Sequence, residues 1–201
     1  MQIKDRIRGY LPVVVDIETA GFNCETDAML EICAVIIGID EYGKLFPKEP
    51  EHFHIEPFSG ANLEPAALKF NGIDVYNPLR GAVKEKLALN EMFKTIRTEM
   101  KTQDCTRSIL VGHNAFFDLG FLYAASNRSK LKSPFHQFST IDTVSLSALA
   151  FGETVLAKAI AKAGIEFDNK QAHSALYDTV KTAELFCQIF NSLDFSITEK
   201  D

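Results

Sequence analysis

Two long apolar runs within the first forty residues most restrict how this chain can fold. Leu11 to Ile17 (LPVVVDI) is rich in β-branched residues, and Met29 to Ile39 (MLEICAVIIGI) ends at the turn-like sequence Asp40-Glu41-Tyr42-Gly43. β-branched and apolar runs of this length are typical of strands. With a third, alternating segment at His52 to Ile55, they predict an antiparallel meander at the start of the chain.

The remainder of the chain alternates between strand and helix patterns. Between Arg80 and Lys101, apolar residues recur every three or four positions, which is typical of an amphipathic helix. Two more strands are predicted at Ile109 to Val111 and Phe138 to Ile141. Further helices are predicted after Asn114 and over Thr143 to Phe151, Val155 to Ala163 and Ser174 to Ser192. We therefore expect an α/β fold with a central mixed five-stranded sheet flanked by helices.

Length and composition set the broad class of the protein. With 201 residues, we expect a single domain over residues 1–193 and a C-terminal tail over 194–201. No apolar run approaches the roughly 18 residues of a membrane span, so we expect no membrane contact and a cytoplasmic location. The four cysteines are widely spaced, which predicts reduced core thiols. The net charge of −6 by itself argues against a nucleic-acid partner.

Acidic residues follow two of the predicted strands. Asp16 and Glu18 are two residues apart on a strand and therefore project from one face. Such a pair alone is better explained as a solvated strand end, but Asp118 adds a third carboxylate beyond the strand that ends at Val111. Site residues of α/β sheets gather at such strand ends. Since no Lys or Arg lies nearby in the first strand, a divalent metal ion is the natural compensation for these charges.

His173 and Asp178 lie at the start of the last predicted helix. Positions five apart diverge by roughly 140° around a helix, so we expect His173 on the preceding loop and Asp178 to reach inward from the first turns. Oxygen ligands without thiolates favour Mg²⁺ or Mn²⁺ over zinc. Two such ions suit phosphodiester hydrolysis, in which a neutral histidine can take the proton of the attacking water.

Three segments, VVVDIETAGF, LVGHNAFFD and QAHSALYDT, resemble the motifs of the DEDDh exonuclease superfamily, named for four acidic residues and a histidine. The similarity extends from about Arg6 to Phe190. It implies a ribonuclease-H-like fold, a homodimer with two Mg²⁺ per active site, and removal of 3′ nucleotides from tRNA and other stable RNA precursors and from single-stranded DNA. The metal ligands would be Asp16, Glu18, Asp118 and Asp178, and His173 would be the general base.

The resemblance also implies where the substrate binds. Aromatic rings wedge against the terminal bases in this superfamily, and the matching residues are Phe22, Phe70, Phe117 and Phe138. Where the family has a base-contacting glutamate, this chain has Ala66, with Glu64 two residues earlier. A basic patch that serves the partner subunit's site matches Arg6, Arg8, Lys101 and Arg107. A local positive patch answers the objection from net charge, because phosphate binding depends on local charge.

Two alternatives stay open from the sequence. One is a proofreading exonuclease or an oligoribonuclease of the same superfamily, and the other is a non-catalytic nucleic-acid-binding module. His113 is interpreted as structural. His52 and His54 would share a strand face, but with no third ligand in view we assign them no metal.

Overall fold

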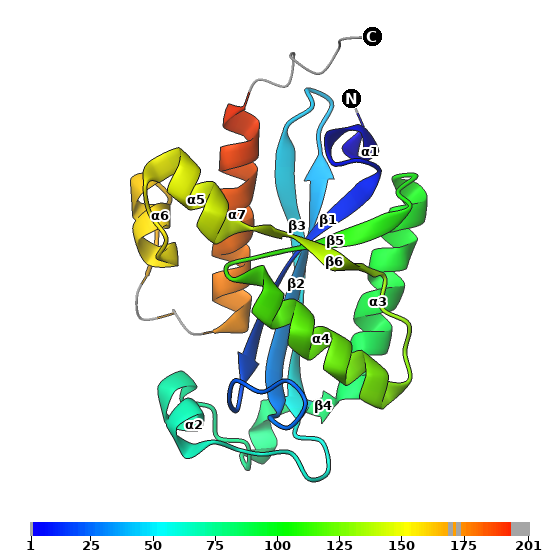
Figure 1. The fold of residues 1–201 in the computed structure, drawn as a ribbon, viewed down its shortest axis with the longest axis vertical. Helices are drawn as coiled ribbons and strands as arrows, with labels where there is room; N and C mark the ends of the chain where they lie inside the picture. Colours follow the sequence, from blue (N-terminus) through cyan, green and yellow to red (C-terminus); the bar gives the residue numbers. More distant parts are fainter. Residues whose placement is uncertain (1, 169–170, 172–173, 194–201) are drawn as a thin grey trace.

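The computed structural model describes residues 2–168, 171 and 174–193, and within them six strands form one sheet in the order β4-β3-β2-β1-β5-β6 (Figure 1). β1, β2 and β3 pair antiparallel, as the predicted meander requires, while β5 and β6 run parallel to β1. The strands are β1 (Tyr10–Thr19), β2 (Met29–Ile39), β3 (Leu45–Glu56), β4 (Val83–Lys84), β5 (Arg107–Gly112) and β6 (Phe135–Asp142).

The mixed α/β sheet is confirmed, but the prediction of five strands was wrong. The additional strand, β4, has only two residues and pairs parallel with Ile55 and Glu56 at the end of β3. A segment this short carries no hydrophobic periodicity, so only its pairing with a residue far away in sequence defines it. The predicted third and fifth strands are also longer in the structure, where β3 begins at Leu45 and β6 at Phe135.

The predicted helices begin and end close to the expected positions, with one exception, and the two helices nearest the N-terminus were not predicted. The helix predicted from Arg80 begins at Glu85, because Pro78–Arg80 forms a short 3₁₀ turn (η1) that ends at Gly81 in the left-handed region, at φ +60°. The sequence patterns did not predict the helix α2 (Pro65–Asn71). The others are α1 (Ile3–Arg6), α3 (Glu85–Thr102), α4 (Ala115–Ser129), α5 (Thr143–Phe151), α6 (Leu156–Lys162) and α7 (Ala175–Ser192).

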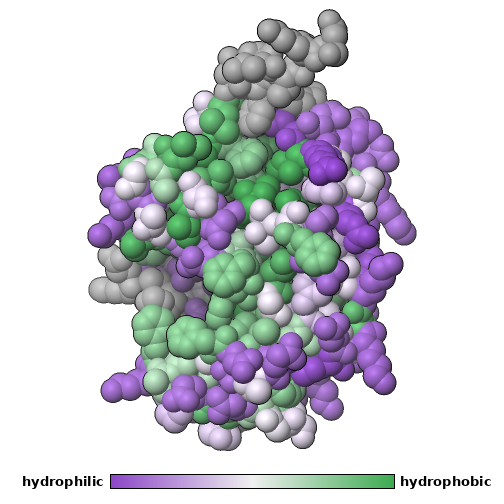
Figure 2. Space-filling model, in the orientation of Figure 1, coloured by the Kyte–Doolittle hydropathy of each residue, from purple (hydrophilic) through white to green (hydrophobic). Residues whose placement is uncertain are grey.

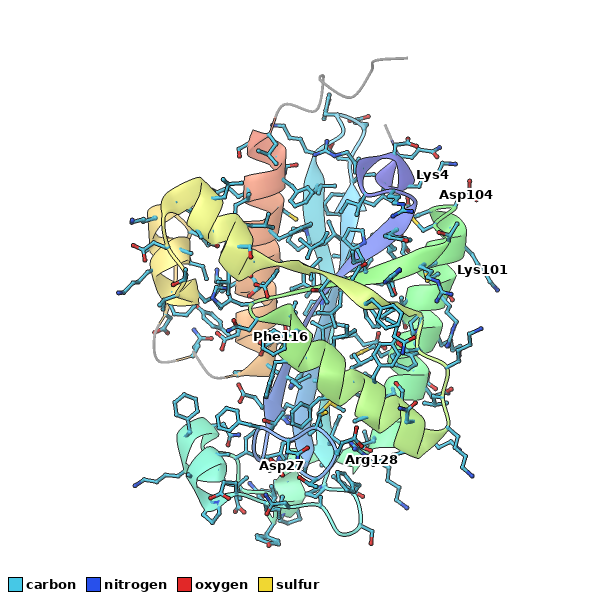
Figure 3. The ribbon with its side chains drawn as sticks, in the orientation of Figure 1. Lys4, Asp27, Lys101, Asp104, Phe116 and Arg128 are labelled. Atoms are coloured by element: carbon cyan, nitrogen blue, oxygen red, sulfur yellow. The ribbon has the colours of Figure 1, made fainter. Side chains whose placement is uncertain are left out.

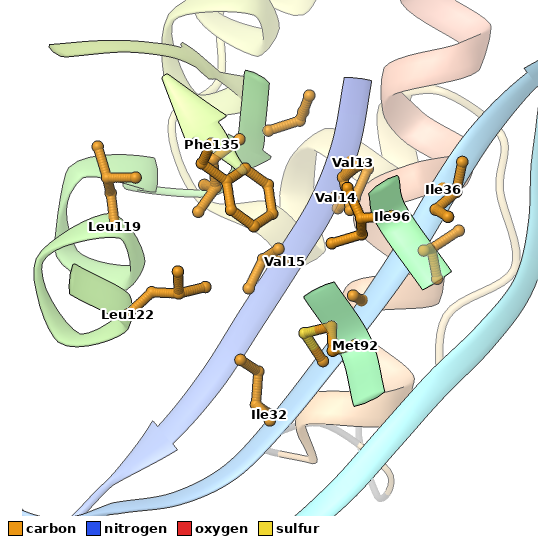
Figure 4. Close-up of a cluster of buried hydrophobic side chains, with 14 of the residues drawn as sticks. Val13, Val14, Val15, Ile32, Ile36, Met92, Ile96, Leu119, Leu122 and Phe135 are labelled. Atoms are coloured by element: carbon orange, nitrogen blue, oxygen red, sulfur yellow. The ribbon is translucent and has the colours of Figure 1, made fainter. Parts of the chain in front are cut away.

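Helices cover both faces of the sheet. α7 packs on β1, β2 and β3, while α3 and α4 lie on the opposite face (Figure 1). Every residue of β2 except Ile39 is buried, as expected for a strand with both faces covered. Side chains from α3, α4 and β6 pack against those of β1 and β2 (Figure 4). The core there contains Val13, Val15, Ile32 and Ile36 from the two strands and Met92, Ile96, Leu119, Leu122 and Phe135 from the surrounding elements.

Two smaller observations bear on the predicted class. All four cysteines are free thiols, and Cys33, Cys105 and Cys187 are buried. Within the described residues, no single helix is both long and apolar enough to cross a membrane, although α5 and α6 together, across a bend of 41°, meet the criteria of length and composition.

Candidate active site

Three carboxylates meet on the face of the sheet that α7 covers. Asp16 and Glu18 project from the end of β1, and Asp178 comes from the first turn of α7. One carboxylate oxygen from each residue lies within 4.8 Å of the other two. The structure therefore brings together three of the four predicted metal ligands, from two elements separated by more than 150 residues of sequence.

Asp118, the fourth predicted ligand, approaches β1 from α4. Its side chain is only 4% exposed, and its Oδ1 accepts a hydrogen bond from the backbone N–H of Ile17 at 3.1 Å. Ile17 lies between Asp16 and Glu18, so this bond fixes α4 directly against the acidic end of β1. The negative charge of Asp118 also acts on Asp16.

A residue that the sequence analysis did not identify, Asp142, positions the start of α4. Its Oδ2 accepts from the N–H of Ala115 at 3.0 Å, and its Oδ1 accepts from Asn114 at 3.3 Å and from Val144 at 2.8 Å. One carboxylate therefore caps both α4 and α5. The available signal was an aspartate directly before the helix that begins at Thr143, since aspartate is a preferred N-cap residue.

Burial and mutual repulsion make the ionised form of this cluster unfavourable. Burial, followed by the charges of Asp178 and Glu31, raises the pKa of Glu18 to about 8. Burial, followed by the charges of Asp118 and Glu18, raises the pKa of Asp16 well above its ordinary value. Burial also raises the pKa of Asp118, against the hydrogen bond that it accepts from Ile17. Near neutral pH, a cation bound beside these groups would therefore favour their fully ionised form.

The donor set fits a divalent metal ion. Within the described part of the chain, no Lys or Arg forms an ion pair with Asp16, Glu18 or Asp118. Several carboxylate oxygens gathered without a basic partner are the ligands that hard divalent cations prefer. The carboxylate cluster can therefore bind divalent metal.

Of His113 and His173, only His113 belongs to the described residues. His113 Nδ1 lies 3.0 Å from Thr143 Oγ1 and its Nε2 lies 2.9 Å from the carbonyl oxygen of Thr154, while burial lowers its pKa. The ring therefore links the segment after β5 to the start of α5 and to the segment between α5 and α6, which agrees with a structural role. His173 lies outside the described residues, and α7 begins at Ala175.

An apolar cavity of about 370 Å³ adjoins the carboxylates, and Glu18 belongs to its wall. Phe22, Phe70 and Phe117 line it, and the rings of Phe22 and Phe117 meet edge to face at 6.2 Å. Phe22 is 90% exposed and Phe70 is 71% exposed, so the cavity presents two large apolar side chains to solvent. On the face shown in Figure 2, hydrophobic residues gather over the start of α4 and beside α2.

The remaining predicted contacts to the base are divided between two places. Ala66 and Glu64 both line the same cavity, at the start of α2. Phe138, by contrast, is exposed on β6 and lines a separate hollow with Arg107 and Lys132. Within one protomer, the structure therefore groups three of the four predicted stacking rings.

The loop that carries Phe22 is held by a buried carboxylate. Asp27 is 6% exposed and accepts hydrogen bonds from Asn23, Thr26 and Asn62 at 2.8–3.0 Å. Arg128 adds a link from α4, since its Nη1 donates to the carbonyl oxygen of Cys24 at 3.0 Å while its Nε and Nη2 bind buried Glu85 (Figure 3). These bonds fix the loop beside the cavity.

The four predicted basic residues do not form one uniform patch. Arg6 is half-buried and donates to the backbone carbonyls of Gly43 and Phe190, whereas Arg8 is exposed. Lys101 and Arg107 line a hollow beside α3. Two cations that the sequence analysis did not select, Arg97 and Lys132, line the same hollow.

A model of the exonuclease family matches residues 13–186, a range that includes all four carboxylates. The chain belongs to the exonuclease family. Among curated relatives, the ribonuclease T of Vibrio parahaemolyticus serotype O3:K6 is 64% identical over 193 residues, which cover 95% of this chain and 90% of the relative. The ribonuclease T of Enterobacter sp. (strain 638) is 60% identical over 188 residues, which cover 93% and 84%.

Solved exonuclease structures show the same fold. E. coli exonuclease I in complex with a dT13 oligonucleotide has a TM-score of 0.67 at 19% identity, and the match covers 90% of this chain but only 41% of that chain. A full-length 3′-exonuclease has a TM-score of 0.69 at 16% identity, and the match covers 90% and 81%. The predicted ribonuclease-H-like fold is confirmed by these neighbours.

The predicted enzyme class is confirmed as well. The chain is a 3′-to-5′ exonuclease, a hydrolase of phosphodiester bonds, and the relatives favour the predicted exoribonuclease over both alternatives. The individual roles of the carboxylates, His173, the phenylalanines and the basic residues stay predictions.

Proposed function

We propose that this exonuclease trims the 3′ ends of tRNA and other stable RNA precursors, acts also on single-stranded DNA, and works as a cytoplasmic homodimer with one domain over residues 1–193. The curated relatives are named ribonuclease T and align with 92–95% of this chain, which supports RNA as the main substrate. Solved neighbours of the same fold include E. coli exonuclease I in complex with a dT13 oligonucleotide and an ExoI–ssDNA complex.

A single observation carries this proposal: Glu18 belongs both to the carboxylate cluster and to the wall of the aromatic cavity. A 3′-terminal base that stacks between Phe22, Phe70 and Phe117 would hold its own phosphodiester group beside the carboxylates. Stacking on aromatic side chains contributes roughly 1–3 kcal/mol per base and tolerates most sequences. Such a site favours chain ends over internal positions, because only a terminal nucleotide can enter the cavity. Phe138 would contact the nucleic acid outside this cavity.

We assign two Mg²⁺ ions, with Mn²⁺ as a substitute, to Asp16, Glu18, Asp118 and Asp178. When bound, two such metal ions would neutralise charge on the scissile phosphate and lower the pKa of the attacking water. Asp118 holds α4 against β1 through its bond from Ile17, which keeps the carboxylates in register. His173 accepts the proton of the attacking water.

One departure from the family pattern affects the preference for terminal bases. The residue matched to a base-contacting glutamate is Ala66, and Glu64 lines the same cavity one residue before α2 begins. A methyl group offers no hydrogen bond to a base. We therefore propose that base selection in this chain falls to stacking and to Glu64, while the hydrolytic chemistry is unaffected.

The exonuclease proposal is tested with a 5′-labelled single-stranded RNA that carries a tRNA-like 3′ overhang. With Mg²⁺, we expect stepwise shortening from the 3′ end by the wild-type chain and almost none by Asp16→Asn. Asp104→Asn is the matched control, because Asp104 is an exposed aspartate that pairs with Lys4. Equal activity of Asp16→Asn and the wild type, or products released from internal positions, would contradict the proposal. A two-to-five-nucleotide RNA tests the oligoribonuclease alternative.

The role of His173 has a separate test. We expect His173→Ala to lower turnover by roughly 10²- to 10⁴-fold, the usual contribution of a general base, while Mg²⁺ affinity by calorimetry stays near that of the wild type. A matching loss of Mg²⁺ affinity would instead identify His173 as a ligand.

A further inference from the structure

A second cluster of metal-ligating side chains lies beside the carboxylates, on the same face of the sheet. Directly paired residues of neighbouring strands project from one face, so the register of β1, β2 and β3 places Glu31 between Glu18 and His54. His52 lies two residues from His54 and therefore shares this face. The sequence analysis left the two histidines without a third ligand, and the register of β2 against β3 supplies Glu31.

The ligand atoms of these three residues converge. His54 Nδ1 lies 2.9 Å from Glu31 Oε1, and His52 Nε2 lies 3.5 Å from Glu31 Oε2. One atom from each residue lies within 4.8 Å of the other two. An ion with bonds of about 2.0–2.1 Å in tetrahedral geometry separates its ligand atoms by about 3.3 Å. The observed separations therefore bracket those of a zinc site.

The orientation of the imidazole nitrogens is a second observation. His52 Nε2 and His54 Nδ1 are both shielded from solvent, and both face the Glu31 carboxylate. Two shielded imidazole nitrogens that converge on one carboxylate form a donor set that can hold a cation. A cation between the nitrogens and the carboxylate would satisfy both nitrogen lone pairs.

We propose that Glu31, His52 and His54 form a zinc-binding site that is separate from the catalytic carboxylates. Two imidazoles and one carboxylate suit Zn²⁺ better than Mg²⁺, which prefers an all-oxygen shell. The three side chains leave one position of a tetrahedral ion for water. The His54 side chain is 36% exposed, so solvent and the ion reach the cluster from its side.

The position of this site in the sheet defines what the ion does. Glu31 belongs to β2 and both histidines belong to β3, so the ion crosslinks two strands next to Glu18. A ligand that binds only the folded state stabilises that state by mass action. Zinc therefore strengthens the strand pair that supports one side of the catalytic cluster, while Mg²⁺ occupies the carboxylates.

The experiment is a Zn²⁺ titration of the full, untagged chain by calorimetry, in buffer with Mg²⁺ in large excess to saturate the carboxylates. We expect one Zn²⁺ to bind to the wild type and to Asp16→Asn. We expect its affinity to fall at least roughly tenfold in His52→Ala and in His54→Ala. Co²⁺ in place of Zn²⁺ should give the strong visible absorption of a four-coordinate ion in the wild type and not in the histidine variants.

His52→Gln and His54→Gln, checked by circular dichroism, replace any alanine variant that fails to fold. His136→Ala is a matched control, because His136 lies on β6 and its Nδ1 accepts from the backbone of Phe138 and Ser139. If zinc binding disappears in Asp16→Asn and persists in the histidine variants, the ion occupies the catalytic site and the proposal is wrong. The absence of Zn²⁺ binding to the wild type would also overturn it, leaving these residues as an ion pair.

Discussion

Burial and neighbouring negative charges raise the pKa of Glu18. It belongs to the carboxylate cluster and to the wall of the aromatic cavity, it pairs with Glu31 across β1 and β2, and no cationic side chain of the described residues forms an ion pair with it. An acid in such a place is easier to protonate than in the unfolded chain. Metal binding must therefore displace a proton, and the displaced proton can be measured.

The pH dependence of stability follows from the raised pKa of Glu18. Its pKa is about 8 in the folded chain against 4.5 for an unperturbed glutamate, so the native state binds more protons between these pH values. The free energy of unfolding of the metal-free chain should therefore fall as pH rises from about 4.5 to about 8. Urea unfolding in EDTA across this range measures the fall, with Glu18→Gln as the control that flattens this contribution.

With saturating Mg²⁺, the free energy of unfolding should instead rise with pH over this range, because Mg²⁺ binds the ionised carboxylates of the folded chain. Calorimetric Mg²⁺ titrations in two buffers of different ionisation enthalpy should show proton release at pH 6.5 and little at pH 9. Constant stability of the metal-free wild type relative to Glu18→Gln, with no proton release, would show that Glu18 is already ionised.

Elements other than β1 position Asp118 and Phe22 beside the carboxylates that β1 carries. Asp142 caps α4 and α5 with one carboxylate, which sets the position of Asp118. The loop before β2 holds Phe22 over the cavity through Asp27. α4 reaches this loop and the start of α3 through Arg128. The cavity and the carboxylates are thus parts of one connected arrangement.

Gly21 is required in the Phe22 loop by close approach. A Cβ there would lie 2.0 Å from Asp27 Oδ2 and 2.6 Å from its Cγ, and hydrogen bonds hold Asp27 in place. Gly21→Ala should therefore lower the free energy of unfolding by about 1–3 kcal/mol, as overpacking typically does, and raise KM for RNA because Phe22 is displaced. Urea unfolding and initial rates measure both effects.

The matched control is Gly120→Ala, within α4. Its Cβ would meet Cys24 Sγ at 3.8 Å, an ordinary contact, and alanine is favoured over glycine in a helix by roughly 1 kcal/mol. We expect this variant to be as stable as the wild type or more so, with unchanged KM. Equal KM values for the wild type and Gly21→Ala would mean that the loop does not position Phe22 for substrate.

Across the whole protomer, the carboxylates lie in a different region from the hollow that Arg97, Lys101, Arg107 and Lys132 line. Lys101, on α3, is well separated from Phe116 at the start of α4 (Figure 3). A long substrate that enters one protomer's cavity would thus find its phosphate contacts on a second protomer, as the proposed homodimer provides.

Subunit mixing tests this arrangement. A triple variant, Arg8→Ala/Lys101→Ala/Arg107→Ala, and Asp16→Asn should each be nearly inactive on long RNA. If the basic residues serve the partner's site, a mixture should regain activity, since one site per mixed dimer then has both parts. Arg6 is retained, because its bonds to Gly43 and Phe190 give it a structural role. Equilibrium sedimentation establishes that mixed dimers form, and inactive mixed dimers would contradict sharing in trans.

Local sequence patterns account for much of the fold and for the order of the candidate site residues along the chain. The β-branched run before Asp16 makes β1 a strand, and strand geometry alone puts Asp16 and Glu18 on one face. Periodicity likewise indicated α3 and α7, within a few residues of their ends. Each of these inferences depends on neighbours within a few positions along the chain, so no knowledge of distant contacts was needed.

Which distant residues meet depends on strand register and on packing between remote segments. The two-residue strand β4, the double cap by Asp142, the engagement of Arg6 and the meeting of Glu31 with His52 and His54 all arise from the pairing register or from packing between remote segments. Sequence periodicity reports only which side of its own element a residue occupies. Which partner faces it is set by how the strands and helices close around one core, and that depends on the whole chain at once.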